Sequence, residues 1–253
     1  MKTVLITGAS SGIGKALGYK FAAEGFNLIL VARRASTLEQ IKQDIKTTYQ
    51  VSVHVESCDL AVLGNARYLY EKLKTLQIDV MINNAGFGDY GFPWEVNLEK
   101  ANNMIDLNIK ALTDLSLLYV KDYADREATL INTASIGGYV QIDIAVTYCA
   151  TKFYVASFTE GLALAMQSQN KRMRVKVLAP AATRTEFVDQ ASYQGGIDGE
   201  TLFSPEVFIS AEQLAEYAYQ LYESDQVVGI VNENNQFDLK DPVYPQLIMG
   251  TSS

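Results

Sequence analysis

Short apolar runs alternate along the chain with longer stretches in which apolar residues recur at helical spacing. Most of the short runs are rich in β-branched residues and nearly continuous in apolar character, which is typical of parallel strands covered on both faces. Seven such runs span Lys2–Thr7, Asn27–Ala32, Val51–Val55, Asp79–Asn83, Ala128–Thr133, Arg174–Ala179 and Val227–Val231. Helical spacing recurs near residues 12–25, 36–49, 61–77, 97–119, 146–170 and 211–223. This alternation predicts an α/β fold with a doubly wound parallel sheet and right-handed crossovers.

The length and the continuity of this pattern bear on domain organisation. The chain has 253 residues and no Pro/Gly/Ser linker or internal repeat, so we predict a single domain over residues 1–253. The stretch 184–210 has weak periodicity and several glycines. Long loops in compact domains are usually functional, so we predict a substrate lid there that excludes water when it closes.

Composition narrows the class of protein. Apolar residues make up 48% and charged residues 20% of the chain, which is ordinary for a soluble globular protein. The net charge of -8 argues against nucleic-acid and anionic-membrane partners. The sequence has no apolar run of roughly 18 residues and no recognisable leader, since Met1–Thr7 already reads as a strand. With two cysteines, Cys58 and Cys149, expected as reduced thiols, we predict a cytoplasmic protein.

A glycine-rich turn follows the first predicted strand. Residues 7–14 read Thr-Gly-Ala-Ser-Ser-Gly-Ile-Gly and lead directly into a helical pattern. Glycines let the backbone turn tightly and approach a pyrophosphate, and the helix N-terminus offers free N–H groups and a partial positive charge. A tight strand-to-helix turn would also use glycines, but this position in the chain favours a dinucleotide site. The predicted contacts are Gly8, Ser10, Ser11, Gly12, Ile13 and Gly14.

The end of the second predicted strand indicates which nicotinamide cofactor fits. A site for NAD commonly places Asp or Glu there to bind the ribose 2′-hydroxyl. This chain has Arg33 and Arg34 instead. Two guanidinium groups suit a 2′-phosphate, which arginine can bind through two hydrogen bonds. The sequence therefore predicts NADP(H), although two solvated arginines before a helix would look the same.

A tyrosine and a lysine lie four residues apart in a predicted helix, and so on one face of it. The pair is Tyr148 and Lys152. A phenol with a pKa near 10 is a poor acid or base at neutral pH, and a nearby ammonium is expected to lower that pKa. Ser135 follows the strand Ala128–Thr133 at its carboxyl end, where ligands bind in open α/β sheets. Its hydroxyl could donate to a substrate oxygen.

Together these motifs resemble the short-chain dehydrogenase/reductase family. The resemblance rests on Thr7–Gly14, the sequence Asn-Asn-Ala-Gly at residues 83–86, Asn108, Ser135, and Tyr148 with Lys152. The motifs occur in the family's order over almost the whole chain, from residue 3 to about 185. The resemblance implies a Rossmann-type fold of about seven strands and hydride transfer between a nicotinamide cofactor and a carbonyl or alcohol.

The resemblance also implies roles for individual residues. Tyr148 would be the general acid or base, Ser135 would orient the substrate oxygen, and Lys152 would lower the tyrosine pKa and hold the nicotinamide ribose. Asn108 would anchor a water that passes protons to Lys152. Further cofactor contacts carried over from the family are Asp59, Leu60, Asn84, Ala85, Gly86, Pro180, Thr183 and Thr185. The chain departs from the family at Ala181, where Pro-Gly is usual, and a backbone angle that alanine disfavours would affect the nicotinamide geometry.

The predicted function is carbonyl reduction or alcohol oxidation on a moderately hydrophobic ketone, diketone or aldehyde. Tyr139, Val140 and Ile142 lie between Ser135 and Tyr148 and are the predicted substrate contacts. The aromatic residues of segment 87–94 either line the substrate pocket or pack against a loop or a second subunit. The family resemblance implies a homodimer or homotetramer, with the helices near 97–119 and 146–170 as contact surfaces.

Other functions would use the same residues differently. A dinucleotide-binding sensor or scaffold without turnover would not need the phenol of Tyr148. An epimerase or dehydratase would keep the cofactor, but the short C-terminal part leaves little room for a sugar-nucleotide domain. His54 is the only histidine, so a Ser-His-Asp hydrolase would depend on one strand residue, and no His/Cys cluster indicates a metal.

Overall fold

Eight strands form one sheet in the computed structural model, which describes residues 1–184, 208–232 and 234–248. The strands lie in the order β10-β9-β6-β5-β4-β1-β2-β3, and only β10 runs antiparallel to its neighbour. Leu5 of β1 pairs with Ile29 on one side and Met81 on the other. The bounds are β1 Thr3–Thr7, β2 Asn27–Ala32, β3 Val53–Ser57, β4 Val80–Asn83, β5 Thr129–Thr133, β6 Arg174–Ala179, β9 Val228–Val231 and β10 Phe237–Lys240.

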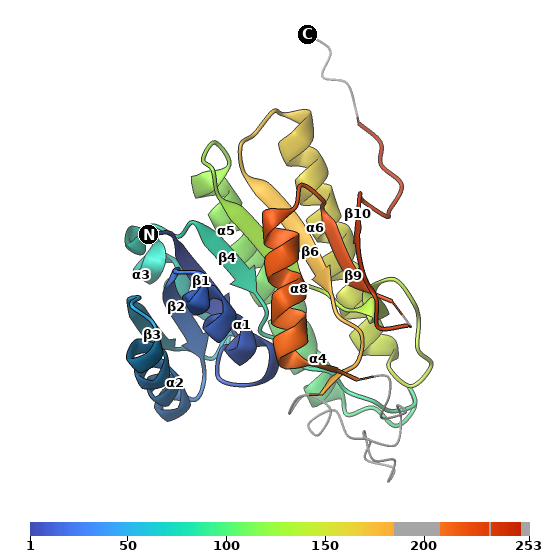
Figure 1. Cartoon of the computed structure of the whole chain (residues 1–253). Coiled ribbons are helices and arrows are strands. Elements are labelled where there is room, and N and C mark those ends of the chain that lie inside the picture. Colours follow the sequence, from blue (N-terminus) through green and yellow to red (C-terminus); the bar gives the residue numbers. More distant parts are fainter. Residues whose placement is uncertain (185–207, 233, 249–253) are drawn as a thin grey trace.

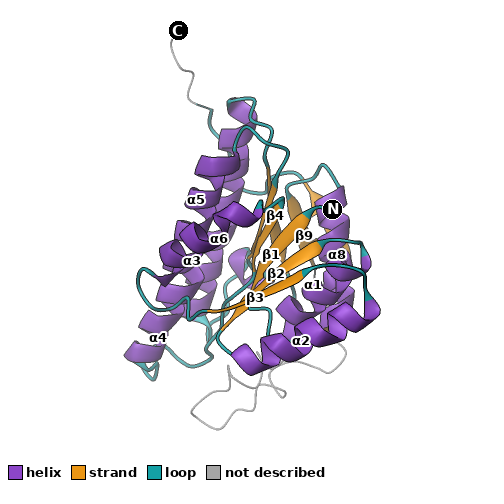
Figure 2. Ribbon diagram, turned by 90° about the vertical axis from the view of Figure 1, so that its left-hand side faces the viewer, coloured by secondary structure: helices purple, strands orange, loops and turns teal. Residues whose placement is uncertain are grey.

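Helices cover both faces of the sheet and make a three-layer structure (Figures 1 and 2). On one face lie α1 (Gly12–Ala23), α2 (Ala35–Thr48) and α8 (Ala211–Glu223). On the other lie α3 (Asn65–Leu73), α4 (Leu98–Ile105), α5 (Leu112–Tyr123) and α6 (Val146–Ser168). The doubly wound sheet predicted from the apolar pattern is confirmed, and so is the Rossmann-type fold implied by the family resemblance, with eight strands where about seven were expected.

The structure departs from the predicted bounds at several elements. The region 97–119 is interrupted by a π-helical turn, η2 (Asp106–Ala111), and region 61–77 ends in a 3₁₀ turn, η1 (Lys74–Leu76). Strand β3 begins at Val53 instead of Val51. The pattern missed β10, because its polar residues pair only with β9 at the edge of the sheet.

The predicted lid cannot be compared with the structure, because residues 185–207 lie outside the described part. The described ends of that stretch, Thr183–Arg184 (β7) and Ile209–Ser210 (β8), pair in parallel as a two-stranded ribbon. Thr185, a predicted cofactor contact, also lies outside the described residues.

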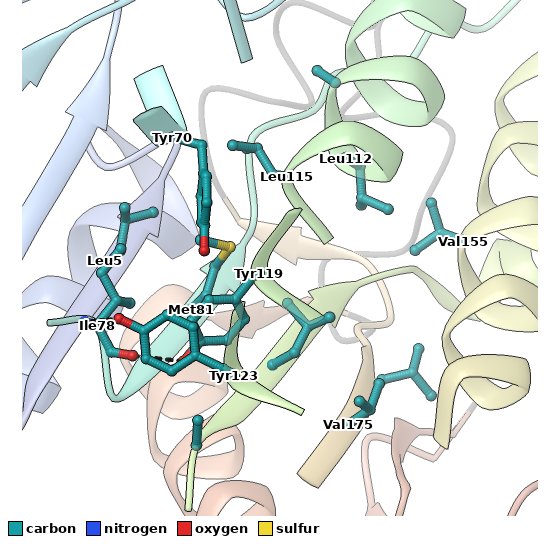
Figure 3. Close-up of a cluster of buried hydrophobic side chains, with 14 of the residues drawn as sticks. Leu5, Tyr70, Ile78, Met81, Leu112, Leu115, Tyr119, Tyr123, Val155 and Val175 are labelled. Atoms are coloured by element: carbon teal, nitrogen blue, oxygen red, sulfur yellow. Dashed lines mark hydrogen bonds between the residues drawn. The ribbon is translucent and has the colours of Figure 1, made fainter. Parts of the chain in front are cut away.

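The two faces of the sheet bury separate apolar clusters. Side chains of α1, α2 and α8 pack on one face, and those of α3, α5 and α6 pack on the other. In the second cluster the hydroxyl of Tyr119 donates to the carbonyl oxygen of Ile78 at 2.8 Å, and the Tyr123 hydroxyl accepts from the Ile78 amide at 2.9 Å (Figure 3). Both tyrosines on α5 thus satisfy backbone groups just before β4, at the end of that strand remote from the glycine turn.

This buried contact predicts a measurable loss of stability. Tyr119 is 0% exposed, so Tyr119→Phe leaves the Ile78 carbonyl without its phenol donor. We expect the free energy of unfolding to fall by about 1–2 kcal/mol in urea denaturation. The control is Tyr68→Phe, which alters a side chain that is 69% exposed and should change stability by less than about 0.5 kcal/mol. An equal effect of the two substitutions would contradict the role of this hydrogen bond.

Candidate active site

The strand order reverses between β1 and β4, and the glycine turn and the turn after β4 meet there. Connections leave these neighbouring strands toward opposite faces of the sheet, which opens a crevice at their carboxyl ends. Thr7 joins the two turns, because its hydroxyl accepts from the amides of Asn84 and Ala85, both at 3.0 Å. The side-chain amide of Asn84 donates to the Thr7 carbonyl at 3.1 Å.

The glycine turn has no room for side chains. Gly8 and Gly12 have φ of 70° and 48°, a left-handed conformation that glycine adopts without strain. A Cβ on Gly14 would lie 2.2 Å from the carbonyl oxygen of Gly8. The start of α1 therefore packs directly on the turn, and the backbone N–H groups at its N-terminus stay accessible to an anion.

A pocket of about 430 Å³ lies over this turn, and we call it the glycine-loop pocket. Its lining includes thirteen residues that the sequence assigned to the cofactor: Gly8, Ser10, Ser11, Gly12, Ile13, Gly14, Arg33, Arg34, Asp59, Leu60, Asn84, Ala85 and Gly86. The volume is within the range of small-molecule sites. The structure thus brings together segments that follow four different strands.

Two arginines at the end of β2 give one side of this pocket a positive charge. The Arg34 guanidinium donates to the Ser10 hydroxyl at 3.2 Å and to the Ser10 carbonyl at 3.4 Å, so it ties the α2 start to the glycine turn. The carbonyl of Arg33 accepts from the Ser57 hydroxyl at 3.0 Å, which fixes its backbone against β3. Both side chains are exposed to the pocket side and to solvent.

Tyr148 and Lys152 lie on one face of α6, both buried, with exposed fractions of 8% and 6%. The Lys152 ammonium is 5.8 Å from the centre of the Tyr148 ring and donates to the Thr133 carbonyl at 3.0 Å. Ser135 begins a 3₁₀ turn, η3 (Ile136–Gly138), and its hydroxyl accepts from the Gly137 amide at 3.1 Å. Ser135 also shares a hydrogen bond with Tyr148. The predicted triad of Ser135, Tyr148 and Lys152 is therefore assembled in the structure.

Burial shifts the pKa values of both Tyr148 and Lys152. It raises the pKa of the Tyr148 phenol well above its usual value, and the hydrogen bond with Ser135 acts in the opposite direction. Burial also lowers the pKa of Lys152 to about 8. We predicted that the ammonium would bring the tyrosine pKa down, but the net direction for Tyr148 is upward, because desolvation of the phenolate dominates. Tyr148 is thus a neutral phenol at neutral pH, with a proton to donate.

Asn108 connects the catalytic group to the glycine-loop pocket. It is 1% exposed and sits in the π-helical turn η2, a feature found frequently at functional sites. Its amide nitrogen donates to the Phe87 carbonyl at 2.9 Å and to the Thr151 hydroxyl at 3.1 Å, and its oxygen accepts from the Phe87 amide at 3.1 Å. A Cβ on Gly86 would lie 2.9 Å from that oxygen and 3.6 Å from Nζ of Lys152. Gly86, which lines the pocket, therefore abuts both catalytic candidates.

The turn after β6 supplies the remaining predicted contacts. The Pro180 carbonyl accepts from the Ile136 amide at 2.7 Å, so Pro180 lies against the turn that begins at Ser135. Thr183 is 7% exposed and donates to the Ala181 carbonyl at 3.0 Å. Among the described residues, the non-glycine positions with positive φ are Gln77, Asn170 and Asn235, so Ala181 takes a conformation that alanine tolerates. The backbone strain considered for Ala181 is absent.

The three predicted substrate contacts, Tyr139, Val140 and Ile142, have different surroundings in the structure. Ile142 packs in a small cluster with Tyr148, Tyr90 and Met104, which gives the catalytic phenol apolar surroundings. Val140 is 45% exposed. Tyr139 donates its hydroxyl to Glu160 at 2.7 Å and stacks on Tyr244.

The pocket also has lining residues that the sequence did not reveal. These are Val31, Ala32, Cys58, Lys100 and Leu107. Phe87, which belongs to the aromatic segment 87–94, lines this pocket as well. Lys100 lies on α4 and pairs with Asp89, and no motif or spacing distinguishes it from a lysine on a solvated helix face. Leu107 directly precedes Asn108 in η2, so the family motif at Asn108 was a signal for it.

Comparisons with known proteins identify the family to which the chain belongs. The family model described as short chain dehydrogenase matches residues 2–194. The chain is 34% identical over 191 residues to an NADP-dependent 3-hydroxy acid dehydrogenase of Schizosaccharomyces pombe, covering 74% of this chain and 73% of that protein. A short-chain dehydrogenase from Sphingobium yanoikuyae in complex with NADPH has a TM-score of 0.80 and 31% identity, covering 91% and 87% of the two chains.

A third comparison is with a bulky-bulky ketone specific alcohol dehydrogenase from Comamonas testosteroni. Its TM-score is 0.78 and its identity 27%, with 91% of this chain and 86% of that chain covered. Within the described ranges, no helix is long and apolar enough to cross a membrane. No group of three or more His, Cys, Asp or Glu side chains is arranged to hold a metal ion in that same part of the chain.

The lowered pKa of Lys152 predicts a pH-dependent stability difference. The folded-state pKa of about 8 lies below the usual value of 10.5, so between these values the unfolded chain binds the extra proton. The wild type should then gain stability relative to Lys152→Met as pH rises from 8 to 10, by up to about 1.4 kcal/mol per pH unit. Urea denaturation of both proteins across this range measures the difference. A difference that stays constant, or that moves the other way, would contradict a Lys152 pKa lowered by burial.

Proposed function

The chain belongs to the short-chain dehydrogenase family, and on this premise we propose that it is an NADPH-dependent carbonyl reductase. It transfers hydride to a moderately hydrophobic ketone, diketone or aldehyde, and the reverse alcohol oxidation follows from microscopic reversibility. The observation that carries the proposal is the contact at Gly86. There the glycine-loop pocket meets Asn108 and Lys152, next to Tyr148 and Ser135.

The residues of the pocket fit a dinucleotide phosphate. The turn at Gly8, Gly12 and Gly14 excludes side chains and leaves N–H groups for a pyrophosphate. Arg33 and Arg34 provide cations where an NAD site commonly has a carboxylate. Asp59 and Leu60 line the same pocket and suit the adenine edge. The NADPH complex of the Sphingobium yanoikuyae relative and the NADP-dependent Schizosaccharomyces pombe relative support this assignment.

The chemistry divides between the cofactor and the protein. When bound, NADPH supplies the hydride. Tyr148, a neutral phenol at neutral pH, donates the proton to the carbonyl oxygen, and Ser135 holds that oxygen by a hydrogen bond. Lys152, fixed by the Thr133 carbonyl, binds the ribose and returns a proton toward Tyr148. The Asn108 oxygen has a second lone pair with which it holds a water near Lys152.

Apolar surroundings support the substrate class. Tyr90, Met104 and Ile142 pack with Tyr148, so a substrate carbonyl that reaches the phenol leaves its substituents among apolar side chains. Of the three residues predicted from sequence, Ile142 has the strongest support as a substrate contact. The bulky-bulky ketone specificity of the Comamonas testosteroni relative fits the same class.

We also propose that the protein works in the cytoplasm as a homodimer or homotetramer. Cys58 and Cys149 are both free thiols, as expected in a reducing compartment. Helices α5 and α6 carry exposed apolar side chains at Leu117, Val146 and Tyr154, with exposed fractions of 48%, 51% and 37%. These side chains support the two helices as subunit contacts.

The first prediction concerns turnover. Consumption of NADPH against a panel of ketones, diketones and aldehydes should identify at least one substrate, and Tyr148→Phe should lower kcat on it by about a hundredfold or more. Unchanged turnover in Tyr148→Phe would contradict the role of the phenol as acid. No consumption by the wild type on a broad panel, with NADPH bound, would favour a dinucleotide sensor.

The second prediction concerns the cofactor. Arg33→Ala removes a cation at the 2′-phosphate, so the Kd for NADPH should rise about tenfold or more while the Kd for NADH changes little. Fluorescence titration of both cofactors measures this. Lys46→Ala, in the last turn of helix α2 and far along the chain from Arg33, is the control for loss of an exposed positive charge. Binding of NADH as tight as NADPH by the wild type would overturn the assignment.

The third prediction concerns assembly. Light scattering on the purified protein should give the mass of two or four chains. Leu117→Asp should shift this mass toward that of one chain, because it places a charge in the apolar contact on α5. A wild-type mass of one chain at micromolar concentration would contradict the oligomer.

A further inference from the structure

A buried carboxylate on α6 has no part in the proposed chemistry. Glu160 is 2% exposed and lies eight residues after Lys152 on the same helix. One carboxylate oxygen accepts from the Tyr139 hydroxyl at 2.7 Å. The other accepts from the backbone amides of Val243 and Tyr244, both at 2.8 Å. Hydrogen bonds to an ionised acceptor are strong, so this carboxylate fixes two segments about a hundred residues apart in the sequence.

The segment fixed by the two amides is the tail, residues 241–248, which follows the edge strand β10 (Figure 1). The tail also contacts the other segment directly. The Tyr244 hydroxyl donates to the Gly138 carbonyl, and the Tyr244 ring stacks on Tyr139 with centroids 5.5 Å apart and planes 19° apart. Glu160 and Tyr244 therefore hold Gly138 and Tyr139 from two directions.

Gly138 and Tyr139 end the Ser135 loop, residues 135–139. Within it the Ser135 hydroxyl accepts from the Gly137 amide, so the orientation of that hydroxyl depends on the turn η3. A Cβ on Gly138 would lie 2.6 Å from the Lys152 carbonyl oxygen, so the loop packs directly on α6 beside the catalytic lysine. The loop is thus confined between α6 on one side and the tail on the other.

We propose that Glu160 and Tyr244 are positioning residues for Ser135: they clamp the end of its loop against α6, so that its hydroxyl points to Tyr148 and the substrate oxygen. The inference rests on the proposed function only for what Ser135 does to a substrate. The clamp itself rests on the contacts of Glu160 and Tyr244.

The clamp contacts the Ser135 loop and not the glycine-loop pocket. The glycine-loop pocket has neither Glu160 nor Tyr244 in its lining, so its own geometry does not use them. Releasing the loop should therefore reduce catalysis by misplacing Ser135, while NADPH binding is retained. Displacements on the order of 1 Å at reacting groups cost up to about a hundredfold in rate.

The test uses phenylalanine variants that remove single hydroxyl groups and keep the rings. Tyr244→Phe removes the bond to the Gly138 carbonyl, and Tyr139→Phe removes the bond to Glu160. Glu160→Gln is the conservative variant, because its oxygen can still accept from the amides of Val243 and Tyr244 while its NH2 group donates to the Tyr139 hydroxyl. The matched control is Tyr119→Phe, which also removes a bond from a tyrosine hydroxyl to a backbone carbonyl, at the opposite end of the sheet.

Two readouts are taken for each variant: kcat and KM for NADPH well below the melting temperature, and amide hydrogen exchange of residues 135–139. Tyr244→Phe and Tyr139→Phe should lower kcat about tenfold, leave KM for NADPH within about twofold, and raise exchange in the Ser135 loop. Glu160→Gln should keep kcat and exchange closer to the wild-type values. Tyr119→Phe should lower stability by a similar amount and change neither readout.

The result that overturns the inference is an unchanged kcat with unchanged exchange in Tyr244→Phe, or an equal fall of kcat in Tyr119→Phe. A rise in KM for NADPH that accounts for the whole loss of activity also overturns it. If the wild type reduces no carbonyl, the proposed function fails, and the exchange data still decide whether the clamp exists.

Discussion

The turn after β4 packs so closely on Asn108 of η2 that a side chain at Gly86 would clash with it. A Cβ on Gly86 would lie within 2.9 Å of the Asn108 oxygen and 3.6 Å of the Lys152 nitrogen. Gly86 lines the glycine-loop pocket and also lies against Asn108 and Lys152, so this pocket borders the buried catalytic candidates. This arrangement also requires the two turns to be held together, which Thr7 does through the amides of Asn84 and Ala85. The cofactor proposal and the catalytic proposal both depend on this junction.

Burial of Lys152 and Tyr148 at this junction disfavours their charged forms, which costs stability for the lysine but keeps the proton on the tyrosine. Lys152 is buried and donates to the Thr133 carbonyl, and burial lowers its pKa to about 8. Tyr148 is buried beside it, and its pKa rises instead of falling. A phenol that keeps its proton suits reduction, in which that proton goes to the carbonyl oxygen. The anionic groups of a bound dinucleotide would favour the charged form of Lys152, so ligand binding and protonation of the site are coupled.

Much of this could be predicted from the sequence, because both the fold and the cofactor turn have periodic or local signals. Apolar runs located seven strands of the sheet, and the spacing of Gly8, Gly12 and Gly14 located the pocket. Strand β10 was missed because a polar edge strand has no such pattern. Lys100 and Glu160 were missed because their roles come from tertiary contacts with Asp89, Val243 and Tyr244. The direction of the Tyr148 pKa was mistaken because spacing reveals a neighbouring charge but not the extent of burial.

The central claim is that hydride passes from NADPH to a carbonyl carbon while Tyr148 supplies the proton. Its most direct test uses NADPH carrying deuterium at the reactive face of nicotinamide C4, with a ketone or aldehyde in ordinary water. We expect one deuterium on the carbinol carbon of the product, detected by mass spectrometry or NMR, and loss of this transfer in Tyr148→Phe. Product without deuterium at that carbon, or full transfer in the variant, would contradict it.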